Sequence, residues 1–173
     1  MTIPHSAGPR VCLAERPAVP AARGVLTIDR GVDERGMPVR GHRYTVELRV
    51  YGKTLDLDAI TREAGLRPCR TRLAGSRLGN RTFDESMWAF NGDGPPDWDS
   101  LEEGLTFVLD RVATLEKLFA RYEAEHDVIW WCGHFQRSFD GGPTLSAGLL
   151  ARLGAFGAEL FIDNYFSSDE KAE

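Results

Sequence analysis

A cysteine and a histidine stand close together in the stretch "DVIWWCGHF", residues 127–135, and both residue types can carry chemistry. If this stretch is a β-strand, Cys132 and His134 point to the same face, because side chains alternate along a strand. A cysteine nucleophile needs a nearby base or a helix N-terminus, and a zinc site needs three or four ligands. With Asp140 from the segment that follows, one interpretation is a small-molecule-binding or hydrolytic site made of Cys132, His134 and Asp140.

Burial alone also explains this stretch. Cysteine is among the most buried residue types, and each large apolar side chain contributes about 1.5 to 3 kcal/mol when it is fully buried. No third ligand is marked by its spacing from Cys132 and His134. We therefore expect a core strand with no catalytic residues, no metal and no cofactor. The three cysteines lack CxxC spacing, so reduced thiols are expected.

Five arginines lie within "RPCRTRLAGSRLGNR", residues 67–81, among glycine, serine and asparagine. Guanidinium groups make bidentate contacts with carboxylates and phosphates, although the segment lacks the pattern of a P-loop. One interpretation is a solvated loop whose arginines pair with Asp97, Glu102 and Glu103, each pair contributing about 0.2 to 1 kcal/mol. The other is a partner-binding segment, with these residues: Arg67, Arg70, Arg72, Arg77 and Arg81.

Charge is divided unevenly along the chain. Residues 1–82 carry 15 bases and 8 acids, whereas residues 83–173 carry 6 bases and 18 acids, and together they give the net charge of -5. Such polarity indicates either that the two halves of the chain face each other in the fold or that the protein binds a charged partner. An acidic protein is the partner that would suit the arginines. Nucleic acid is disfavoured, because the chain as a whole is acidic.

A chain of 173 residues is expected to hold one domain. Residues 1–40 are rich in proline and lack periodicity, which predicts a flexible or irregular N-terminal segment, although "GVLTID" at 24–29 could add an edge strand. The single domain is expected at 41–167, followed by a C-terminal tail at 168–173. No run approaches the roughly 18 apolar residues of a membrane span and no signal peptide is evident, so we expect a cytoplasmic protein. The sequence does not specify an oligomeric state.

The elements alternate between strands and helices. Period-two alternation predicts a strand at "RYTVELRVYG", and short apolar runs predict strands at 86–90, 127–135 and 158–166. A short helix follows Asp56 and ends at Gly65, and another begins at Ser146 and ends at Gly157. The longest helix is expected to start at Asp99, with Glu102 completing a capping box. The order β-α-β-α-β-α-β predicts an α+β fold: a mixed, largely antiparallel sheet of four to five strands, with helices packed mainly on one face.

Several of these segments are similar, in order and spacing, to a known family. They are a strand ending "VYG", the helix "LDLDAITREAGLRP", an isolated Trp88, the helix opening "WDSLEEGLTFVLDRV" and the closing run "GGPTLSAGLLARLGAFGAELFIDNYF". Over about residues 43–166 the chain resembles the bacterial family called domain of unknown function 4279. The resemblance implies a compact α+β domain and, for some relatives, a setting among toxin-immunity genes, but no catalytic residues. The expected function is therefore a non-enzymatic macromolecule-binding domain of an immunity-type or regulatory role.

Overall fold

The computed structural model describes residues 41–136 and 141–166. The predicted N-terminal segment with its "GVLTID" strand, the C-terminal tail and Asp140 all lie outside these residues. The longer strands are β1 (Arg43–Gly52), β5 (Ser86–Phe90), β6 (Asp127–Gln136) and β7 (Glu159–Phe166), and the short ones are β2 (Arg70–Arg72), β3 (Arg77–Leu78) and β4 (Arg81–Thr82). The helices are α1 (Leu57–Ala64), α2 (Leu101–Val112), α3 (Glu116–Glu123) and α4 (Ala147–Phe156), with a 3-10 turn η1 (Ala113–Leu115) between α2 and α3.

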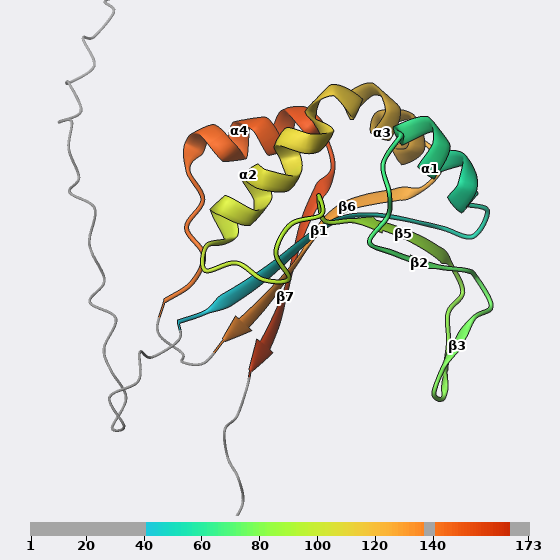
Figure 1. The fold of residues 1–173 in the computed structure, drawn as a ribbon, viewed down its shortest axis with the longest axis horizontal. Helices are drawn as coiled ribbons and strands as arrows, with labels where there is room; N and C mark the ends of the chain where they lie inside the picture. The colour runs from blue at the N-terminus through green and yellow to red at the C-terminus, as the bar shows by residue number, and fades with distance from the viewer. Residues whose placement is uncertain (1–40, 137–140, 167–173) are drawn as a thin grey trace, which may run out of the picture.

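Five strands form one sheet in the order β2-β5-β1-β6-β7. Strand β1 runs antiparallel to both β5 and β6, and β2 runs antiparallel to β5, whereas β7 lies parallel to β6. The four helices lie on one side of this sheet (Figure 1). The predicted α+β class, with a mixed and largely antiparallel sheet, is confirmed.

The core lies between the sheet and the helix layer. Every second residue of β1 faces the helices, and the same alternation holds for Trp88 of β5 and for Trp130 of β6. These side chains meet the apolar stripe of α2, which includes Leu105 and Val108. The period-two pattern of the sequence therefore corresponds to one covered and one uncovered face of the sheet.

Helix ends were largely predictable from local chemistry. The Oδ1 atom of Asp56 accepts hydrogen bonds from the backbone N–H groups of Asp58 and Ala59, at 3.0 and 2.9 Å. Gly65 and Gly157 end their helices with φ of 64° and 90°, in the left-handed region that glycine adopts without steric cost. The N-cap at Ser146 is also confirmed.

The longest predicted helix differs from the structure in two ways. Its N-cap is Ser100, whose Oγ accepts from the backbone N–H of Glu103 at 3.4 Å, so the predicted cap at Asp99 with a box at Glu102 was wrong. The carboxylate of Asp99 is bound by Arg43, and that of Glu102 accepts from the backbone N–H of Ser146 instead. The helix is also divided by η1, a break that the apolar stripe does not reveal because its spacing continues across it. The predicted order of elements further omits β2, β3 and β4, which lie in the segment expected to be a loop.

Candidate functional site

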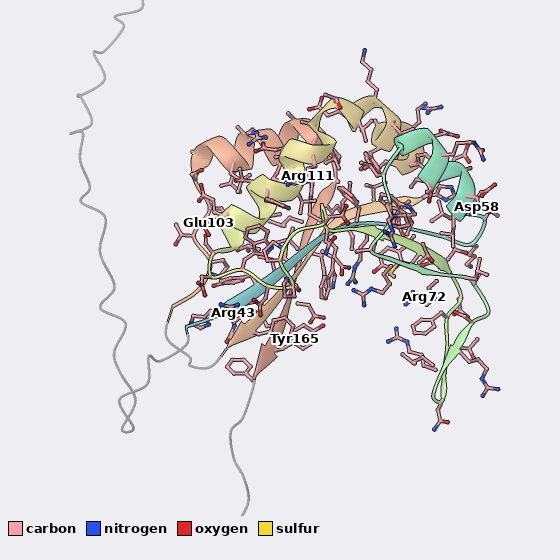
Figure 2. All side chains as sticks on the ribbon, viewed as in Figure 1. Arg43, Asp58, Arg72, Glu103, Arg111 and Tyr165 are labelled. Carbon is pink, nitrogen blue, oxygen red and sulfur yellow. The ribbon has the colours of Figure 1, made fainter. Side chains whose placement is uncertain are left out.

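The sheet face opposite the helices is covered by no helix or strand of residues 41–136 and 141–166. Strand register places Glu47, Arg49 and Tyr51 of β1 on this face. Their neighbours on the same face are Arg70, Arg72, Met87, Ala89, Ile129, Trp131, Gly133, Phe135, Glu159, Phe161, Asp163 and Tyr165. Figure 2 shows Arg72 and Tyr165 on the side away from the helices, while Asp58, Glu103 and Arg111 project from the helix layer. We call this surface the open face.

An ion pair and an aromatic ring lie side by side at the centre of the open face. The Nε–H of Arg49 donates to a carboxylate oxygen of Glu47 at 2.6 Å, and its Nη1 donates to the hydroxyl of Tyr51 at 3.0 Å. The guanidinium carbon of Arg49 also lies 3.6 Å from the ring centroid of Trp131, a cation–π contact. Arg70 binds the second oxygen of Glu47. Both oxygens of this nearly buried carboxylate therefore have arginine partners.

The hairpin of β3 and β4 projects from one end of the sheet, away from the helices (Figure 1). At its base the ring of Phe83 has two arginines over it, with the guanidinium carbon of Arg72 at 3.6 Å and that of Arg81 at 5.0 Å from the ring centroid. Between the hairpin and β1 lies a hollow of about 560 Å³, which we call the arginine hollow. Its charged lining residues are the cations Lys53, Arg72 and Arg81 and the carboxylates Asp84 and Glu85. Three cationic side chains therefore meet at this depression, where they outnumber the two carboxylates.

Arg72 illustrates the electrostatics of this hollow. Burial is the largest effect on the pKa of Arg72 and lowers it. The charge interaction with Tyr51 raises this pKa, whereas the nearby positive charges lower it further; they belong to Arg81, Arg49 and Arg70. Its Nε is buried without a hydrogen-bond partner among the described residues. An anion placed in the hollow would offset the repulsion between these positive charges.

The five predicted partner-binding arginines are only partly brought together. Arg70, Arg72 and Arg81 border the open face and the hollow, whereas Arg77 is exposed on β3 and Arg67 is exposed in the loop before β2. The expected ion pairs of these arginines with Asp97, Glu102 and Glu103 were wrong. Arg70 pairs with Glu47, a residue on the neighbouring part of the sheet, and Asp97 is bound by Arg43.

Acidic residues occupy another hollow at the same end of the sheet. This depression, of about 510 Å³, is lined by the carboxylates Glu85, Glu123, Asp127 and Glu159, and it shares Tyr51 and Glu85 with the arginine hollow. A negatively charged group would therefore be repelled from the acidic hollow and would be placed more favourably in the arginine hollow, where cations outnumber carboxylates. Sequence reasoning missed this acidic group, because its four members come from separate elements.

Cys132 and His134 share one face of β6, as predicted, and that face is the covered one. The Cys132 side chain is fully buried, and burial raises the pKa of its thiol to about 12. His134 is 2% exposed, and its ring nitrogens lie 3.0 Å from Asn164 Oδ1 and 3.1 Å from His42 Nδ1. Burial is also the main cause that lowers the pKa of His134. This geometry suits structural roles better than a nucleophile and its base, because a thiol with a raised pKa is poorly reactive. The third residue of that interpretation, Asp140, lies outside the described residues.

A labelling experiment tests the role of Cys132. In a Cys12→Ser variant, a thiol reagent at pH 7 should modify Cys69, which is exposed, about tenfold or more faster than Cys132, which should react only when the domain unfolds. Denaturant should make both thiols reactive, which is the control for reagent access. Rapid labelling of Cys132 in the native protein would instead support the catalytic interpretation.

The described residues contain no group of three or more histidine, cysteine, aspartate or glutamate side chains placed to hold a metal ion. None of the helices in the described part is long and apolar enough to cross a membrane. The chain is thus an α+β domain whose open face combines arginine and aromatic side chains. Residues 42–167 match the family described as Domain of unknown function (DUF4279), and the chain belongs to that family. No curated protein and no solved structure matches it significantly.

Proposed function

We propose that the domain binds an acidic protein through the arginine hollow and the adjoining open face. The observation that carries this proposal is the convergence of Lys53, Arg72 and Arg81 on one depression beside the sheet, where these cations outnumber the carboxylates Asp84 and Glu85. Protein interfaces are enriched in arginine and aromatic residues, and those residue types also supply most of the binding energy. A carboxylate of the partner would enter the hollow, where it meets the positive charges of Lys53, Arg72 and Arg81.

The centre of the open face supplies an apolar contact beside the charged one. A third hollow, of about 340 Å³, is lined by Trp131, Phe135, Pro95 and Pro96 together with Glu47 and Arg70. Gly133 lies between the two aromatic side chains, and a Cβ there would stand only 2.6 Å from Thr45 Oγ1 and 3.1 Å from each ring. Its lack of a side chain leaves space for both rings. An apolar side chain of the partner suits this third hollow.

The setting of this role is part of the proposal. An immunity-type or regulatory role in a bacterial cytoplasm agrees with the family resemblance. Proteins with such roles act by covering the surface of a partner rather than by catalysis, and the arginine hollow and the open face suit that kind of binding. The catalytic alternative has weaker support, since Cys132 is buried and its thiol pKa is raised.

A matched pair of triple variants tests the proposal. The first, Arg72→Ser with Arg77→Ser and Arg81→Ser, removes three arginines from the hairpin region. The control, Arg62→Ser with Arg121→Ser and Arg152→Ser, removes three exposed arginines from the helix layer. Each variant should shift the free energy of unfolding by only about 1 to 2 kcal/mol, because surface ion pairs and cation–π contacts are weak.

Proteins from a native extract that are retained by the immobilised wild type are then compared across the set. A true partner should be acidic, should be retained by the control and should elute as salt rises. Its affinity for the hairpin variant, measured with the purified partner, should be at least about tenfold weaker, which is about 1.4 kcal/mol. A partner that binds both triple variants equally would place the binding surface elsewhere, and an extract that yields no salt-sensitive partner would count against the proposal.

A further inference from the structure

The outer edge of β7 is the most exposed apolar segment of the sheet. Strand β7 is last in the strand order and pairs with β6 alone among the described residues. Four of its large side chains are exposed by 37% to 55%: Leu160, Phe161, Tyr165 and Phe166. Phe135, at the adjoining end of β6, stacks on Tyr165 with a centroid distance of 4.9 Å and is 38% exposed. Apolar side chains therefore flank this edge on both faces of the sheet.

An edge strand of this kind favours pairing with another strand. Along residues 159–165 its outer side has no strand partner among the described residues, and natural proteins normally protect such edges with charged side chains, proline, a bulge, a very short strand or a covering segment. Strand β7 is eight residues long, and its sequence, ELFIDNYF, contains neither lysine nor proline, although it carries the charged residues Glu159 and Asp163. The opposite edge of the sheet, β2, has only three residues. The two edges thus differ in the protection that they have.

The sequence of β7 is compatible with antiparallel pairing to itself in one register. Residues that face each other across an antiparallel pair lie on the same side of the sheet. With Ile162 opposite Ile162, the remaining pairs are Glu159 with Tyr165, Leu160 with Asn164 and Phe161 with Asp163, and no like charges meet.

Registers whose two-fold centre lies on another residue of β7 are less favourable. A centre at Asp163 sets two carboxylates directly opposite each other, and a centre at Phe161 sets Glu159 against Asp163. Like charges in such positions destabilise the pair. A centre at Asn164 avoids this conflict but pairs fewer residues of the strand, because Phe166 is its last residue.

We propose that two copies of this chain associate through β7 in antiparallel register about Ile162, which joins two five-stranded sheets into one. A two-fold axis through Ile162 makes the contact self-complementary and closed, as in most homodimers. The association leaves the hairpin of β3 and β4 free, because this hairpin follows β2, the strand at the opposite edge of the sheet. The association therefore does not involve the arginine hollow of the proposed binding function, although Phe135 borders both surfaces.

Light scattering combined with size exclusion tests the association. The wild type should show twice the 19.2 kDa of one chain at high concentration and should dissociate on dilution. Tyr165→Glu should shift the protein towards the monomer, because each new carboxylate faces Glu159 of the other copy. Adding Glu159→Lys to that variant should restore the dimer, since the opposed charges then attract. Thermal melts check that both variants stay folded.

A cysteine scan tests the register without relying on destabilisation. In a background with Cys12→Ser, Cys69→Ser and Cys132→Ala, single cysteines are placed at 162, 163 and 164 and the protein is oxidised. Cys132 is removed because it is the register partner of Ile162 within one chain. Only Ile162→Cys should give a disulfide-linked dimer, because only that residue faces its own copy, within the 4.4–6.8 Å between Cα atoms that a disulfide spans. Efficient linkage at 164 rather than 162 would overturn the register.

Two results would overturn the association itself. One is a full-length chain that stays monomeric at every concentration. If such a chain forms dimers only after deletion of residues 1–40, the N-terminal segment of the chain itself occupies the edge, and the proposal is also wrong. The other is a dimer that Tyr165→Glu leaves unchanged, which would place the contact on another surface.

Discussion

Replacing Trp130 with alanine should lower the free energy of unfolding by about 3 to 5 kcal/mol, whereas the same change at Trp131 should cost less than about 2 kcal/mol. The two residues are adjacent in β6, but Trp130 is fully buried among the helices and Trp131 lies on the open face. Removing Trp130 leaves a cavity against Phe156, whose ring centroid lies 5.1 Å away. Removing Trp131 takes away mainly its cation–π contact with Arg49.

Urea denaturation of the two variants measures this difference, and because both remove the same side chain from neighbouring positions, each is the control for the other. Trp131→Ala should in addition weaken binding of the acidic partner, because Trp131 lines the smaller hollow of the open face. Equal losses of stability in the two variants would show that the open face is covered by some part of the chain or by a second copy.

The alternation that separates Trp130 from Trp131 was readable from the sequence, and so was the shared face of Cys132 and His134. The sequence did not show which face of the sheet the helices cover. Period-two alternation divides the side chains of a strand into two groups but does not say which group is buried. The partner of His134 was also beyond reach, since His42 lies 92 residues away and comes close only through the pairing of β1 with β6. Contacts between distant residues depend on register, which local patterns do not specify.

Local chemistry predicted helix ends well where one polar side chain was available, as at Asp56 and Ser146. It failed where two candidates were adjacent. Asp99 and Ser100 can both cap a helix, and the choice is made by Arg43, which binds the carboxylate of Asp99 from another element. The arginine segment was misjudged for a similar reason. Its strands are two or three residues long, too short for periodicity to show, and they form by pairing with each other and with β5.

Arg49 and Arg70 both bind Glu47, and their replacement should have unequal effects on stability. Arg49→Leu should lower the free energy of unfolding by about 2 to 4 kcal/mol, because removing one member of a buried ion pair leaves a poorly compensated charge. The side chains of Arg49 and Glu47 are only 10% and 12% exposed. Arg70→Leu should cost less than about 1 kcal/mol, since the Arg70 side chain is 55% exposed and solvent screens its charge.

A double variant separates the charge from the rest of the Arg49 contacts. Adding Glu47→Leu to Arg49→Leu removes the stranded carboxylate, and buried ion pairs can often be replaced by apolar residues at little cost, so the double variant should recover more than half of the stability lost in Arg49→Leu. Denaturation in urea across the four proteins of the cycle gives the coupling energy. If the double variant is no more stable than Arg49→Leu, the loss comes instead from the contacts of Arg49 with Trp131 and Tyr51, and the centre of the open face is held by stacking rather than by charge.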